Sequence, residues 1–161
     1  DDSDGHAGFS FTKLDGNGNP LPASATQWSC VRDNVTGLIW EVKTDDGGLR
    51  DKDWTYSWYN PDANTNGGSA GYADYGNNCY DPARCDTHKY VADVNSQGLC
   101  GASDWRLASV DELLSIVSND RVNPAIDTDY FPNTRNMWFW SSSPIAYYPH
   151  YAGYVGDNGE V

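Results

Sequence analysis

Four aspartates lie close together in one short segment of the chain: Asp45, Asp46, Asp51 and Asp53. Carboxylate oxygens spaced along a loop are ligands that Ca²⁺ prefers. The segment therefore predicts a Ca²⁺ site, although the spacing matches no complete EF-hand loop. The alternative is an acidic loop that is simply solvated.

A second group with binding chemistry is aromatic and lies near the C-terminus: Tyr147, Tyr148, His150 and Tyr151. Tyrosine offers a rigid ring with a polar handle, which suits the face of a sugar or a protein epitope. Pro149 favours a loop here, so we predict a ligand-binding aromatic loop. Trp138 and Trp140, just before it, are expected in the core.

The residue types of catalysis are present without the spacing that catalysis requires. His6, His88 and His150 have no local partners that resemble a Ser-His-Asp triad. The serines at 141–143 lack the G-x-S-x-G pattern of a nucleophile elbow. We assign no catalytic residue and expect the protein not to be an enzyme.

The four cysteines allow three pairings. Cys79 and Cys85 share a short polar loop, which favours a local Cys79–Cys85 bridge and a long-range Cys30–Cys100 bridge. Disulfides form in oxidising compartments, so this pattern favours an extracellular or cell-surface protein. The alternative is four free thiols in a cytosolic protein. Zinc is disfavoured because no C-x-x-C occurs.

Composition and charge limit the partners. A chain of 161 residues suits one domain, and seven Trp, eleven Tyr and four Phe can fill its core. The formal net charge of −13 disfavours nucleic acid, anionic membranes and sulfated polysaccharides unless cations bridge them. No apolar run is long enough for membrane insertion.

The elements that must position these residues are short. Residues 1–26 form a polar N-terminal segment with an edge strand near Phe9 and Phe11. Residues 27–43 predict a β-hairpin whose turn is Asp-Asn-Val-Thr-Gly at 33–37. Residues 44–85 form a long irregular region in which alternation at 54–58 indicates an extended ribbon.

Two short helices follow that region. Asp86 can cap a helix over 87–97 whose apolar face carries Tyr90, Val91 and Val94, and Gly98 can end it. Residues 104–107 predict a short strand that runs into a second helix, where Ser109 and Glu112 have capping-box spacing. The apolar stripe expected to face the core is Leu113, Leu114, Ile116 and Val117.

The rest of the chain predicts short strands and turns. Residues 138–140 form a strand that enters a serine turn at 141–143, and 154–155 a further strand. We expect Arg106 to form a buried ion pair with a nearby carboxylate. The fold class is therefore α+β, with two short helices, short and mostly antiparallel strands, long loops and disulfide bridges.

Three sequence blocks then stand in order, at 31–40, 104–113 and 140–144. Together they resemble the DUF1566 family, typified by the C-terminal domain of the Legionella collagen-like adhesin. The resemblance implies a single C-type-lectin-like domain over 27–161, related to the formylglycine-generating-enzyme fold. The signatures of calcium-dependent lectins are absent, so calcium-mediated sugar binding of that type is disfavoured.

The resemblance implies an extracellular bacterial binding module of adhesin type, with a glycan or protein ligand. The sulfated ligand of the Legionella example is not carried over, because this chain is strongly acidic. The alternatives are a structural subunit of an extracellular filament and a ligand-binding protein with diversified loops. The family usually closes with a strand beyond Val161, so we expect a strand-pairing neighbour or a homo-oligomer.

Overall fold

The computed structural model describes residue 5, residues 8–145 and the backbone of residues 148–155. Its strands are β1 (Phe11–Leu14), β2 (Cys30–Asp33), β3 (Ile39–Glu41), β4 (Phe139–Ile145) and β5 (Tyr148–Val155). Its helices are α1 (Thr87–Gln97), the 3₁₀ helix η2 (Leu99–Gly101) and α2 (Val110–Leu114). The predicted α+β class, with short antiparallel strands, is confirmed.

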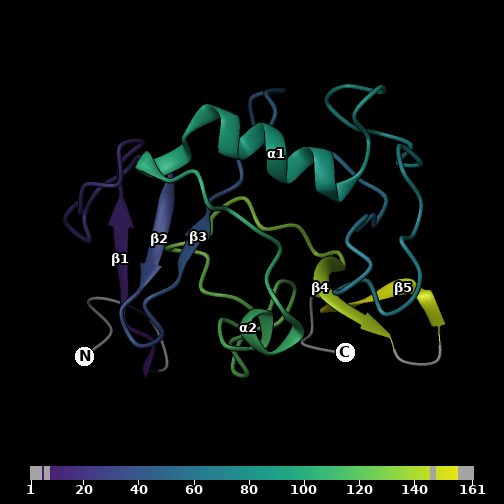
Figure 1. Cartoon of the computed structure of the whole chain (residues 1–161). Coiled ribbons are helices and arrows are strands. Elements are labelled where there is room, and N and C mark those ends of the chain that lie inside the picture. The colour runs from purple at the N-terminus through teal and green to yellow at the C-terminus, as the bar shows by residue number, and fades with distance from the viewer. Residues whose placement is uncertain (1–4, 6–7, 146–147, 156–161) are drawn as a thin grey trace.

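The first three strands form an antiparallel sheet in the order β1-β2-β3 (Figure 1). The predicted turn joins β2 to β3, because the Asp33 carboxylate accepts from the Val35 N–H at 2.8 Å and from the Thr36 hydroxyl at 2.7 Å. Gly37 closes the turn at φ 79°, a conformation that favours glycine. β1 is an edge strand, as predicted for the N-terminal segment.

Each face of this sheet carries its own apolar cluster. On one face, Leu14 and Cys30 pack with Val94 of α1 and with Leu99 of η2. The other face is covered by the 116–131 region, whose Phe131 packs with strand residues from β1 and β2. Alternation along a strand points successive side chains to opposite faces, which explains this division.

Helix α1 occupies the predicted range, with Asp86 as N-cap and Gly98 as C-cap. The Asp86 side chain is fully buried, and it accepts from the backbone N–H of Lys89 at 2.9 Å and of Asp74 at 3.1 Å. One carboxylate therefore caps the helix and holds the preceding irregular region against it.

Helix α2 begins with the predicted capping box. The Ser109 hydroxyl accepts from the Glu112 N–H at 3.2 Å, and the Glu112 carboxylate accepts from the Ser109 N–H at 2.8 Å. The predicted core stripe is wrong at Leu114, which is 36% exposed, whereas Ile116 is buried and Leu113 and Val117 are half-buried. Helix α2 ends at Leu114, so Ile116 and Val117 follow the helix and the four residues do not share one helix face.

Two predictions just before α2 are wrong. Residues 104–107 form no strand, because Asn95 rather than a neighbouring strand binds the backbone: its side chain bonds the N–H and C=O of Trp105. Arg106 does pair with Glu112, at 2.6 Å, but its side chain is 60% exposed. The ion pair is therefore at the surface rather than buried.

The disulfides are Cys30–Cys100, which ties β2 to η2, and Cys79–Cys85, within the irregular region. These are the two pairings that the sequence favours. The 54–58 segment forms no strand and makes isolated bridges, Thr55 with Asn78 and Ser57 with Asp86. The extended-ribbon prediction is confirmed in that limited sense.

The C-terminal part is an antiparallel pair, β4 and β5 (Figure 1). The register of this pair shifts between Trp140 and Pro144 and again between Pro144 and Ile145. The predicted serine turn is wrong, because β4 continues through Ser141–Ser143 to Ile145. The predicted loop is wrong from Tyr148 onward, where the backbone is already in β5. Tyr147 lies outside the described residues. None of the described helices has the length and apolar character needed to cross a bilayer.

Candidate binding site

A groove with a volume of about 1260 Å³ lies between β3, α1, α2 and the segment that leads into β4. Five tryptophans line it, and we call it the aromatic groove: Trp40, Trp54, Trp105, Trp138 and Trp140. Tyr56 and Tyr90 lie at its polar side, with ring centroids 4.9 Å apart. Concave sites lined by aromatic rings, with a few polar groups, are typical of ligand pockets.

Three of these tryptophans are held by hydrogen bonds from the indole N–H to backbone carbonyls. Trp54 donates to Gly48 at 2.7 Å, Trp105 to Leu99 at 3.0 Å and Trp140 to Tyr56 at 2.8 Å. Each bond fixes the ring and also ties an irregular segment to its neighbour. The groove is therefore pre-formed rather than assembled from mobile side chains.

Trp40 and Trp138 differ from these three. The Trp40 N–H is buried and has no acceptor among the described residues. A buried donor without a partner is costly, and an acceptor on a ligand would lower that cost. Trp138 is 67% exposed, so its predicted place in the core is wrong. It lies at the solvent side of the groove, where a ligand can reach it.

A compact polar cluster stands beside the rings. The Tyr90 hydroxyl donates to Glu41 Oε1 at 2.5 Å, and Lys43 Nζ donates to Tyr90 Oη at 2.5 Å. Lys43 Nζ also lies 3.1 Å from Glu41 Oε2. Burial, with the Glu41 charge beside it, raises the pKa of Tyr90 well above its ordinary value. The hydroxyl therefore stays protonated and keeps donating to Glu41.

Tyr56 extends this cluster. Its hydroxyl is buried and makes no hydrogen bond of good geometry, although the Tyr80 N–H lies close enough to act on it. Burial raises the pKa of Tyr56 to about 12, against the opposing effect of that N–H. Like Tyr90, it is a neutral hydroxyl at physiological pH.

Every cationic side chain that lines the groove within the described part of the chain is ion-paired. The four pairs are Lys43–Glu41, Lys52–Asp45, Arg106–Glu112 and Arg135–Asp53. An ammonium or guanidinium beside a carboxylate attracts a second anion only weakly. The groove therefore presents nearly balanced charge to a ligand.

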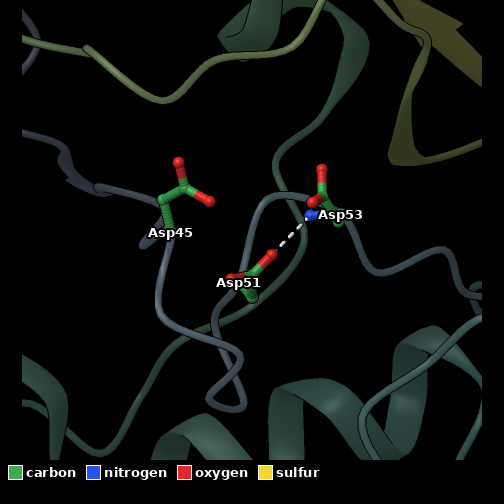
Figure 2. A group of neighbouring side chains, drawn as sticks. All are labelled: Asp45, Asp51 and Asp53. Carbon is green, nitrogen blue, oxygen red and sulfur yellow. Dashed lines mark hydrogen bonds between the residues drawn. The ribbon is translucent and has the colours of Figure 1, made fainter.

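The predicted calcium ligands are partly brought together. Asp45, Asp51 and Asp53 place one carboxylate oxygen each within 4.8 Å of one another (Figure 2). Asp46 turns away, because its carboxylate accepts from the Gly48 N–H at 2.9 Å and the Thr44 hydroxyl at 2.8 Å.

The three clustered carboxylates already have partners. Asp51 accepts from the backbone N–H groups of Asp46, Gly47 and Asp53, at 2.7 to 2.8 Å, which lowers its pKa. Asp45 pairs with Lys52, and Asp53 pairs with Arg135 at 3.0 Å. A cation would have to displace both basic side chains. Calcium binding thus stays a prediction, and the hydrogen bonds alone explain this loop.

That the aromatic residues near the C-terminus bind a ligand remains a prediction. Tyr148, His150 and Tyr151 lie in β5, of which the structure describes the backbone alone. Register places Trp140 opposite Tyr154 and Ile145 opposite Tyr148. Tyr148 is therefore at the far end of the hairpin from the aromatic groove.

Glu41, Lys43 and Tyr90 are the residues that sequence reasoning missed. Tyr90 was expected only as part of the apolar face of the 87–97 helix, together with Val91 and Val94. The sequence does contain a signal for this cluster, because a tyrosine on a buried helix face needs a hydrogen-bond partner for its hydroxyl. That partner, Glu41, ends a strand 49 residues earlier, a pairing that only the tertiary fold reveals.

The described side chains do not form a catalytic arrangement such as a Ser-His-Asp triad. The described histidine side chain, His88, packs edge-on against Tyr59, with ring centroids 6.2 Å apart. Ser141 is fully buried in β4. The expectation that the protein is not an enzyme remains a prediction.

Fold and groove together define a small α+β domain that is closed by two disulfides and carries an aromatic cleft. The model of the family described as the Lcl C-terminal domain matches residues 29–160, and the chain belongs to that family. This confirms the resemblance noted from the three sequence blocks. No curated protein and no solved structure matches the chain significantly. The C-type-lectin-like topology remains a prediction.

Proposed function

We propose that this chain is an extracellular binding module for attachment, and that its ligand binds in the aromatic groove. The observation that carries the proposal is the pre-formed set of tryptophan rings in a cleft of about 1260 Å³. Such rings give contact area at little cost in conformational entropy. The membership of the Lcl C-terminal domain family supports attachment, and the disulfides support an oxidising compartment.

Trp138 is the residue with which to test the groove. It is 67% exposed, so its removal should cost little stability, yet it lines the cleft. Tyr75 is a matched control, because it is 76% exposed and lies outside the groove. The experiment is a screen of immobilised glycans and matrix proteins with the parent, Trp138→Ala and Tyr75→Ala.

We expect a ligand whose binding falls tenfold or more in Trp138→Ala and stays unchanged in Tyr75→Ala. A folded parent protein that binds nothing and polymerises would instead support the filament-subunit alternative. EDTA in a parallel set tests calcium at Asp45, Asp51 and Asp53. Tyr148→Ala/Tyr151→Ala tests the predicted aromatic segment, and loss of binding only there would move the site to β5.

A further inference from the structure

The polar cluster of the groove has hydrogen-bonding capacity left over. Lys43 Nζ carries three protons, and the structure gives it two acceptors, Tyr90 Oη and Glu41 Oε2. Each Glu41 oxygen has one described donor and a further lone pair. The side chains of Lys43 and Glu41 are 29% and 16% exposed. A fixed donor and two fixed acceptors thus stand side by side at an open surface.

Rings flank this cluster. The Lys43 ammonium lies 4.3 Å from the centroid of the Tyr90 ring, and Tyr56 packs against the same ring. The Trp140 indole donates to the Tyr56 carbonyl, which fixes a further ring in the groove wall. The site therefore combines flat apolar faces with a carboxylate and an ammonium in set positions. A sugar ring fits this combination, because it has an apolar face that stacks on aromatic rings and neighbouring hydroxyls that bind charged groups.

Charge decides between classes of ligand. The cations of the groove are neutralised by carboxylates, and the whole chain carries a formal net charge of −13. An acidic or sulfated chain would meet repulsion, with no unpaired cation among the described groove residues to offset it. A sugar without charge avoids that cost and can still use every donor and acceptor of the cluster.

We propose that the aromatic groove binds an uncharged glycan, with a pyranose ring stacked on the aromatic wall and adjacent hydroxyls bound by Glu41 and Lys43. This inference rests on the proposed function, because it takes the groove as the binding site. Glu41 accepts from one hydroxyl, and Lys43 donates to the next. Tyr90 positions both groups through its hydroxyl.

The test is calorimetry with defined hexasaccharides. The neutral probes are cellohexaose, mannohexaose and chitohexaose, and the charged probes are a heparin hexasaccharide and hexagalacturonate. The variants are Glu41→Gln, Lys43→Met and Trp138→Ala. Asp93→Asn is the matched control, because Asp93 is also an ion-paired carboxylate but lies outside the groove. Near-ultraviolet circular dichroism checks that each variant is folded. If Glu41→Gln does not fold, Lys43→Met alone tests the polar cluster.

We expect a neutral probe to bind the parent, with affinity that is insensitive to salt. Glu41→Gln and Lys43→Met should weaken it about tenfold or more, the usual effect of losing a hydrogen bond to a charged group. Asp93→Asn should stay within about twofold.

Preference for a charged probe, or neutral binding that both cluster variants leave intact, would overturn the inference. If only a protein ligand binds, and Trp138→Ala abolishes that binding, the proposed function stands and the glycan inference fails. If glycan binding survives Trp138→Ala and both cluster variants, the groove is not the site, and both proposals fail.

Discussion

At the scale of single residues, Asp86 joins two parts of the chain. Its buried carboxylate caps α1 through Lys89 and also accepts from the Asp74 N–H. Asp86→Ala should lower the free energy of unfolding by about 2–3 kcal/mol, because a helix cap and a buried hydrogen bond are lost together. Urea denaturation followed by circular dichroism measures the change.

Asp111→Asn is the control for Asp86→Ala. Asp111 is exposed in the first turn of α2, so its removal should cost at most a few tenths of a kcal/mol. If the two substitutions lowered the free energy of unfolding equally, Asp86 would be acting as an ordinary surface carboxylate. That result would contradict its buried, hydrogen-bonded position.

Glu112 links stability to pH. Hydrogen bonds from Arg106 and from the Ser109 N–H lower the pKa of Glu112 from 4.5 to about 2. Its folded-state pKa is depressed, so its stabilisation is complete above about pH 4.5 and is lost as pH falls towards about 2. The difference in thermal midpoint between the parent and Glu112→Gln should therefore shrink across this window. A difference that is constant or grows with acid would contradict the assignment.

At the scale of elements, long irregular segments are held by cross-links rather than by sheets. The Trp28 indole donates to the Tyr130 carbonyl at 2.9 Å, and the Trp58 indole donates to the Ser141 carbonyl at 3.1 Å. These bonds connect residues more than 80 positions apart. These tryptophans thus connect distant segments where strands are short.

The two disulfides should differ in their contribution. Cys30–Cys100 closes a separation of 70 residues, and Cys79–Cys85 closes one of 6. Loop-closure entropy gives about 4 kcal/mol for the first and about 2 kcal/mol for the second. The double alanine variants, compared by urea denaturation, should follow that order. A larger loss on removing Cys79–Cys85 would mean that the irregular region, rather than the sheet, limits stability.

The sequence predicted what local chemistry determines. Asp86 and Gly98 mark the ends of α1, and the Ser109 and Glu112 capping box starts α2, because caps depend on residues within one turn. The aromatic groove could not be predicted this way. Its polar cluster joins β3 to α1, and its rings come from segments with no periodic pattern.

The errors share the same cause. Residues 104–107 were expected as a strand, but Asn95 binds the Trp105 backbone instead. Pro149 favoured a loop, whereas the chain runs through it as the outer strand of a two-stranded pair, where a missing N–H is tolerated. In each case a tertiary partner replaced the local preference.

At the scale of the whole molecule, acidity and aromaticity act together. A formal net charge of −13 keeps anionic surfaces away, while the aromatic groove offers a nearly balanced patch. Under the proposed function, such a surface would select ligands by shape and hydrogen bonding rather than by charge. The proposed role in attachment therefore rests on the groove and not on long-range electrostatics.

The most direct test of binding in the aromatic groove is a titration followed by nitrogen-15 NMR of the tryptophan indoles, with the strongest glycan from the screen as the probe. The indole signals of Trp54, Trp105 and Trp140, which line the groove, should shift together. Trp28 and Trp58 lie outside it and should not move. Shifts confined to these two tryptophans, or only in the backbone of β5, would contradict binding in the aromatic groove.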